Sequence, residues 1–137
     1  MEPHTEKYNE ATYNRPEGTR TLNAPVVRIN LPEYIRQIMD EKAWANTTRN
    51  AITLLHNDYM RIVLVAIKGG NEMCHGIDGA LSIQVLSGRI HLETEEESFS
   101  MDEGDMAALQ PRVQHYVYAD EQAIFLLTLA GNEAGEF

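Results

Sequence analysis

The sequence lacks the features that mark several classes of protein. It has a single cysteine, Cys74, so an intrachain disulfide is excluded. No apolar run approaches the roughly 18 residues that a membrane-spanning helix needs. The first residues are polar and carry no apolar stretch of the kind found in secretory signals. From these absences we expect a cytoplasmic protein.

Basic residues are also scarce. Lysine and arginine total 11 against 21 aspartate and glutamate residues, which gives a formal net charge of −10. Such a surface repels phosphate backbones and anionic headgroups. We therefore expect neither nucleic acid nor membrane as a partner.

The 137 residues suffice for one domain with its own hydrophobic core. Residues 1–20 are mostly polar, and we expect them to form a flexible arm. Residues 21–137 should then form a single domain. At its start, residues 24–29 resemble a short strand, and residues 31–42 have the spacing of an amphipathic helix. Asn30 is the expected N-cap of this helix.

From Asn50 onward the chain consists of short β-type runs separated by glycine, aspartate and asparagine turns. This texture is typical of an all-β sandwich or barrel. The expected strands are 51–56, 61–67, 80–86, 89–92, 98–101, 106–109, 116–118 and 123–129.

Two separated motifs lie within this β-rich part. The first is GGNEMCHGIDGALSIQVLSG, residues 69–88, and the second is GDMAALQPRVQH, residues 104–115. In order and distance they resemble the two motifs of the conserved-barrel cupins, in particular small bacterial cupins with a helical N-terminal extension. The resemblance implies an all-β double-stranded β-helix, which is a jelly-roll-like barrel, with one short N-terminal helix. It also implies a homodimer.

In that family three histidines and a glutamate point into the barrel and hold a transition metal. Here Leu81 occupies the glutamate position, counting back from Gly88. The two histidine positions of the first motif fall either on Cys74 and Gly76 or, if the loop is one residue shorter, on His75 and Ile77. We favour the second alignment because it keeps a histidine.

The second motif departs from the family pattern as well. It retains its histidine, His115, but Gln110 replaces the usual proline and Arg112 stands where glycine is common. The resemblance therefore implies a reduced metal site, His75 and His115, for one divalent ion such as Fe, Mn, Ni or Zn. A third ligand could come from Glu72, Cys74 or Gln84.

The alternation of side chains along a strand predicts which residues line the barrel interior. We expect a ligand pocket formed by His75, Leu81, Ile83, Val85 and His115. The preferred hypothesis is a binding module for a small, largely apolar ligand. The alternative is a metal-dependent cupin enzyme of the dioxygenase or isomerase type, for which we can assign no catalytic residue.

The remaining polar residues carry weaker signals. We expect Cys74 to be a small buried thiol and His56 and His91 to be structural histidines. Tyr116 and Tyr118 should share the strand face opposite His115. Together with Ser82, Gln84 and Leu86, which we expect on a neighbouring strand, they should form the homodimer face.

Overall fold

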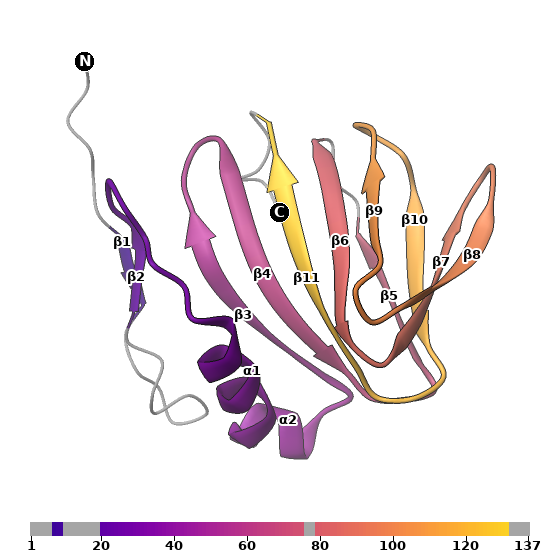
Figure 1. The fold of residues 1–137 in the computed structure, drawn as a ribbon, viewed down its shortest axis with the longest axis horizontal. Coiled ribbons are helices and arrows are strands. Elements are labelled where there is room, and N and C mark those ends of the chain that lie inside the picture. The colour runs from indigo at the N-terminus through magenta and orange to yellow at the C-terminus, as the bar shows by residue number, and fades with distance from the viewer. Residues whose placement is uncertain (1–6, 10–19, 76–78, 132–137) are drawn as a thin grey trace.

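The computed structural model describes residues 7–9, 20–75 and 79–131 of the chain. Most of them form strands of two larger antiparallel sheets that face each other across a common core (Figure 1). This confirms the expected all-β barrel. In the described part of the chain, no helix is long and apolar enough to cross a membrane.

One sheet has five strands in the order β3-β4-β11-β6-β9, and the other has four in the order β5-β10-β7-β8. All neighbouring pairs are antiparallel, and the order places strands that are distant in sequence side by side. The strands of the first sheet are β3 (Arg49–His56), β4 (Met60–Ile67), β11 (Ala123–Ala130), β6 (Ala80–Ser87) and β9 (Met106–Leu109). Those of the second are β5 (Asn71–His75), β10 (His115–Ala119), β7 (Arg89–Thr94) and β8 (Ser98–Asp102).

The space between the sheets is filled by apolar side chains. In β6 the residues Leu81, Ile83 and Val85 are buried, whereas their neighbours on the other face are only half-buried. Phe125 and Leu127 of β11 are fully buried and join the same cluster. Burial of each large aliphatic or aromatic side chain stabilises the fold by roughly 1.5–3 kcal/mol, so this interior is the main source of stability.

The hairpin between β6 and β7 shows why its turn requires glycine. Gly88 has a φ of 80°, which is left-handed backbone. A Cβ atom there would also collide with the backbone carbonyl of Gln122. Both restrictions favour the one residue without a side chain.

Two short helices precede the barrel strands, α1 (Leu31–Asp40) and α2 (Lys42–Asn46). The side chain of Asn30 accepts a hydrogen bond from the amide of Glu33 at 3.2 Å, as expected for an N-cap. The expected single helix through Lys42 is wrong, because Glu41 has extended backbone and interrupts it. Its buried carboxylate accepts hydrogen bonds from Gln37 and from Asn50 of β3, both at 2.9 Å, and these bonds hold the interruption against the sheet.

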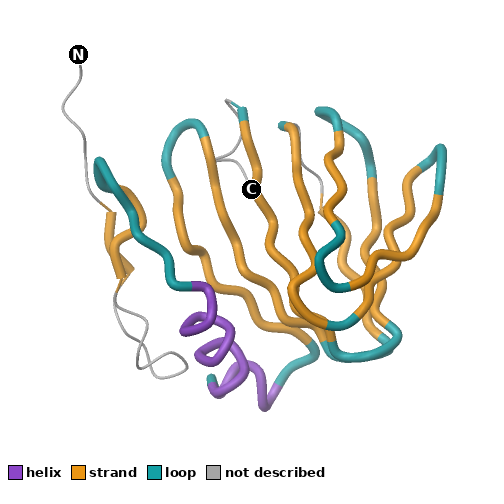
Figure 2. The backbone as a smooth tube through the Cα atoms, in the orientation of Figure 1, coloured by secondary structure: helices purple, strands orange, loops and turns teal. Residues whose placement is uncertain are grey.

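The helices cover the outer face of the five-stranded sheet near β3 and β4 (Figure 2). Ile38 and Trp44 bury their side chains there, and Lys68 lies over the Trp44 ring at 5.0 Å. The resulting outer cluster of buried residues comprises Ile38, Trp44, Ile52, Leu54, Leu64, Ala66 and Ile124. The protein therefore has two apolar cores, one on each side of the same sheet.

The first strands lie beside β3. β1 (Lys7–Asn9) pairs with β2 (Arg20–Asn23), and the Arg20 guanidinium donates a hydrogen bond to the Thr53 carbonyl at 2.6 Å. The strand expected at residues 24–29 is wrong, because this stretch has no regular structure and leads into α1. Of the expected flexible arm, residues 1–20, the structure describes residues 7–9 and 20, and the others lie outside the described residues.

Candidate functional site

His115 lies at the start of β10 and points into the barrel. Its exposed fraction is 1 %, and its Nδ1 atom lies 3.3 Å from the Val113 carbonyl oxygen. Because a carbonyl can only accept, Nδ1 carries the proton in this contact. An imidazole that is protonated at Nδ1 alone presents a lone pair at Nε2, the form in which it accepts a hydrogen bond or ligates a metal.

His75 occupies the last position of β5, directly opposite His115 in the backbone register. On the other side of β10, His115 is paired with Thr94 of β7. The backbone thus brings the two motif histidines together on adjacent strands. The side chain of His75 lies outside the described part of the structure, so its share in a site stays a prediction.

The predicted apolar lining belongs to the opposite sheet. Leu81, Ile83 and Val85 are buried and pack within the cluster that fills the barrel. They face the interior, as strand alternation predicts. The clefts described below are lined by other residues, so a ligand role for these three also remains a prediction.

The candidate third ligands all face away from His115. Cys74 is exposed, because its neighbour Met73 takes the inward position on β5. Glu72 shares the outward face with Cys74, and Gln84 alternates with the core residues of β6. The expectations of a buried Cys74 thiol and of a third ligand from these residues are therefore wrong.

The donors among the described residues are too few for a metal ion. Transition-metal sites in proteins commonly use about three or four side-chain ligands. The described residues contain no group of three or more histidine, cysteine, aspartate or glutamate side chains that could hold a metal ion.

A cleft of about 260 Å³ lies at one end of the barrel, between β7, β8, β9 and the loop that precedes His115. Leu92, Phe99 and Leu109 give it an apolar wall. Val113 and Thr94 connect it to His115, the first through the Nδ1 contact and the second through the strand register. The full lining is Leu92, Thr94, Glu96, Glu97, Phe99, Ala107, Ala108, Leu109, Gln110 and Val113. The second sequence motif covers the part of this lining from β9 and the loop, residues 107–113, but not the part from β7 and β8.

A second, more polar cleft of about 430 Å³ adjoins the first and shares Thr94, Glu96, Gln110 and Val113 with it. Arg112 is part of its lining, and its backbone is left-handed, with a φ of 66°. The position where the motif usually has glycine thus keeps a conformation suited to glycine, although the residue is arginine.

Comparisons with known proteins agree with this topology. No protein-family model matches the sequence, and no curated protein matches it. Solved structures do match. An RmlC-like cupin from Shewanella frigidimarina superposes with a TM-score of 0.57 and 19% identity, over 61% of this chain and 76% of that one. An RmlC-like cupin family protein with a double-stranded β-helix fold, from Methanocaldococcus jannaschii, gives a TM-score of 0.57 and 14% identity, over 64% and 84%.

This chain has the cupin fold. A variant of salicylate 1,2-dioxygenase from Pseudoaminobacter salicylatoxidans also matches, with a TM-score of 0.55 and 17% identity, over 61% of this chain and 26% of the dioxygenase. Likeness at these identities establishes the fold and leaves the activity to be argued from the residues. In this cupin barrel, the argument rests on His115 and the clefts beside it.

Proposed function

We propose that this cupin barrel is a binding module for a small, largely apolar molecule with one polar group. The molecule would lie in the 260 Å³ cleft, with its polar group toward His115 and His75. The observation that carries the proposal is the apolar wall of Leu92, Phe99 and Leu109 in a cleft whose lining residue Val113 contacts the buried His115 imidazole. Ligand sites commonly combine such a wall with a few polar groups that fix orientation.

The size of the cleft limits the ligand. Pockets for drug-sized molecules have volumes of roughly 300–1,000 Å³, so a cleft of about 260 Å³ suits a single ring or a short chain. The neighbouring polar cleft, with Arg112 and Glu96, could take a substituent that remains in contact with water. The class that fits best is a small aromatic or aliphatic compound carrying one hydroxyl or carbonyl group.

The alternative is a metal-dependent enzyme of the dioxygenase or isomerase type. Two features support it: the fold is shared with a salicylate dioxygenase, and His75 and His115 lie opposite each other in the register. These two histidines would hold a divalent ion such as Fe, Mn, Ni or Zn. The described donors do not complete such a site, so we derive no reaction step from a metal and place binding first.

Phenol and toluene provide a matched pair of probes for the binding site, because they have nearly the same shape and differ only in that a hydroxyl group replaces a methyl group. Amide chemical shifts should move for residues around the cleft on titration with phenol. Phenol should bind about threefold more tightly than toluene, the factor expected for one net hydrogen bond. His115→Phe should remove this preference, while Leu109→Ala should weaken both probes.

The same samples test the alternative. Protein purified without a histidine tag should contain much less than one equivalent of metal. One full equivalent, lost in both His75→Ala and His115→Ala, would support the metal enzyme and contradict the binding module. Shift changes that miss the cleft, or a phenol preference that survives His115→Phe, would contradict the proposed site directly.

The expected dimer interface also needs revision. Leu86, Ser82 and Gln84 lie on β6 of the five-stranded sheet, whereas Tyr116 and Tyr118 lie on β10 of the other sheet. The expected composite dimer face is therefore wrong. We retain a homodimer as a proposal and assign it to β9, which is an edge strand of the five-stranded sheet among the described residues. Met106 of this strand is 61% exposed, and exposed strand edges favour association.

A further inference from the structure

The outer face of the four-stranded sheet carries a cleft that the binding module does not use. Its volume is about 400 Å³, and its lining consists of Glu72, His91, Glu93, Ser98, Tyr116 and Tyr118. These residues come from all four strands of the sheet. They point away from the barrel interior, so the cleft is separate from the site beside His115.

The strand register places two tyrosines at the centre of this cleft. Tyr116 of β10 is paired with Cys74 on one side and with Glu93 on the other. Tyr118 is likewise paired with Glu72 and with His91. The tyrosines are 48% and 39% exposed, so their rings remain accessible. The two carboxylates flank the rings from opposite strands.

Hydrogen bonds hold the His91 ring in place at the edge of the cleft. Its Nε2 atom lies 2.6 Å from the Asp120 carboxylate and its Nδ1 atom 2.8 Å from the Ser100 hydroxyl. The ring also lies against that of Tyr118, with centroids 6.0 Å apart. This chain of contacts confirms the structural histidine expected from the sequence and limits the motion of one tyrosine.

The charge of the cleft selects the kind of ligand. Its lining contains two glutamates and no lysine or arginine. Arg89 lies two positions from His91 on the same strand face, but its guanidinium is bound by the Asp102 carboxylate at 2.6 Å. A face of this composition attracts cations and repels anions.

A metal ion is a poor fit here, because the described residues contain no group of three or more ligating side chains. An organic cation suits the lining better, since accessible tyrosine rings attract it through their π faces and carboxylates attract it through charge. We propose that this cleft binds a small organic cation, of the quaternary ammonium or alkylamine class, over Tyr116 and Tyr118 and between Glu72 and Glu93.

The order Asp120, His91, Ser100 also resembles that of a hydrolytic triad, in which a histidine activates a serine. Such a site must stabilise a developing oxyanion. The carboxylates of Glu72 and Glu93, which line the neighbouring cleft, would oppose that negative charge. We therefore interpret the hydrogen-bonded chain as a support for the cleft wall.

Choline and 3,3-dimethylbutan-1-ol test the proposal, because they have the same shape and differ in charge. Choline should shift amide resonances of β5, β10 and β7, with a dissociation constant on the order of 1–10 mM for a ligand of this size on an open surface. The neutral alcohol should bind at least about threefold more weakly. Equal binding of the two probes would overturn the proposal.

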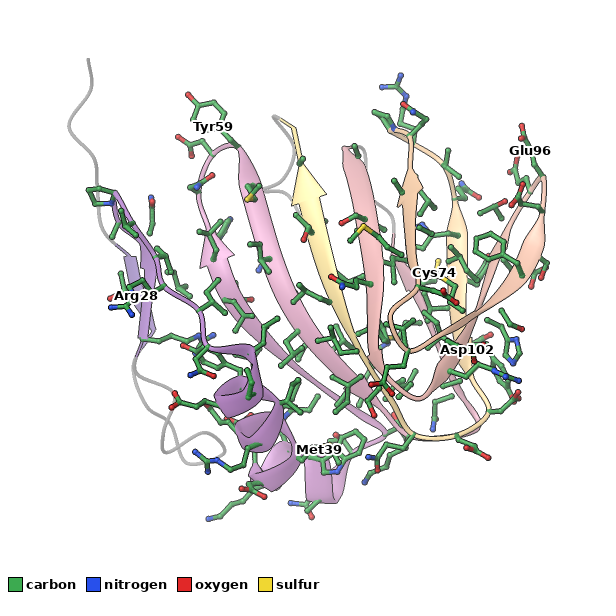
Figure 3. The ribbon with its side chains drawn as sticks, in the orientation of Figure 1. Arg28, Met39, Tyr59, Cys74, Glu96 and Asp102 are labelled. Carbon is green, nitrogen blue, oxygen red and sulfur yellow. The ribbon has the colours of Figure 1, made fainter. Side chains whose placement is uncertain are left out.

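Substitutions with matched controls complete the test. Tyr116→Leu should weaken choline about threefold, the effect of one exposed cation–π contact, and Glu93→Gln about twofold. Tyr59→Leu and Glu103→Gln should leave choline binding unchanged. Each substitution removes the same group as its test variant, but neither residue lines the cleft, and Tyr59 lies on the turn between β3 and β4 (Figure 3). An equal loss of choline affinity in the control variants would show a general effect of surface charge or composition and would contradict the proposed site.

The proposal also requires that the face be free in solution. The molecular mass measured by light scattering should be the same for Tyr116→Leu and the unaltered protein. A drop in mass caused by Tyr116→Leu would assign this face to self-association and overturn the cation site. Because the phenol site lies inside the barrel mouth, failure of either proposal would leave the other intact.

Discussion

Replacing Arg112 with glycine should stabilise the protein. Arg112 has a left-handed backbone, with a φ of 66°, in the loop between β9 and β10. This conformation is sterically unfavourable for a residue with a Cβ atom, because the Cβ lies too close to the following carbonyl oxygen. Glycine has no Cβ and adopts it without that cost.

The expected gain follows from two opposing terms. Left-handed backbone costs a non-glycine residue roughly 1–2 kcal/mol. Glycine increases the conformational freedom of the unfolded chain, which lowers stability by about 0.4–1 kcal/mol. The free energy of unfolding should therefore rise by about 0.5–1 kcal/mol. For a chain of this length the melting temperature should rise by about 2–3 °C.

Thermal and urea unfolding of three proteins would measure this gain: unaltered, Arg112→Gly and Arg112→Ala. Alanine keeps the Cβ atom and removes the guanidinium, so Arg112→Ala should show no gain. If alanine stabilised the protein as much as glycine, the guanidinium would be the cause of the cost. If glycine lowered the melting temperature, contacts of the Arg112 side chain would outweigh the backbone term, and our reasoning would be refuted.

Two further predictions concern a turn and the assembly. Gly88→Ala should destabilise the fold by more than about 2 kcal/mol, because left-handed backbone and a collision with a carbonyl act together. Gly104 also has left-handed backbone, with a φ of 93°, but it has open space around it. Gly104→Ala should therefore lower the free energy of unfolding by only about 1 kcal/mol. Comparable losses in urea unfolding would show that the collision is relieved by movement. For the assembly, light scattering should report a dimer, and Met106→Lys should reduce the mass to about 15.5 kDa. A monomer before substitution would contradict the β9 interface.

The barrel could be predicted from the sequence because it depends on local patterns of apolar and polar residues. Strand β6 alternates apolar and polar residues, and the structure buries Leu81, Ile83 and Val85 as that alternation requires. The cap at Asn30 and the turn at Gly88 are equally local. The cap follows from Asn30 and its immediate neighbours. The left-handed backbone of Gly88 is local as well, although the carbonyl of Gln122 adds a restriction from a distant segment.

The features that could not be predicted from the sequence depend on contacts between distant segments. β5 has no apolar run and was not among the expected strands. It forms a strand because it pairs with β10, and that pairing turns Cys74 outward. The expected dimer face failed for the same reason, because parity along a strand does not reveal which sheet the strand joins. The interruption at Glu41 likewise depends on Asn50, which belongs to a barrel strand.

The apolar cluster beneath the helices makes the five-stranded sheet a shared wall between two compartments. A chain shortened to begin at Arg49 would keep every barrel strand but would expose Ile52, Leu54 and Leu64 to water. Such a patch favours aggregation. The helices therefore act as a solubilising cover for the barrel, and residues 31–46 belong in any minimal version of the protein intended for ligand binding.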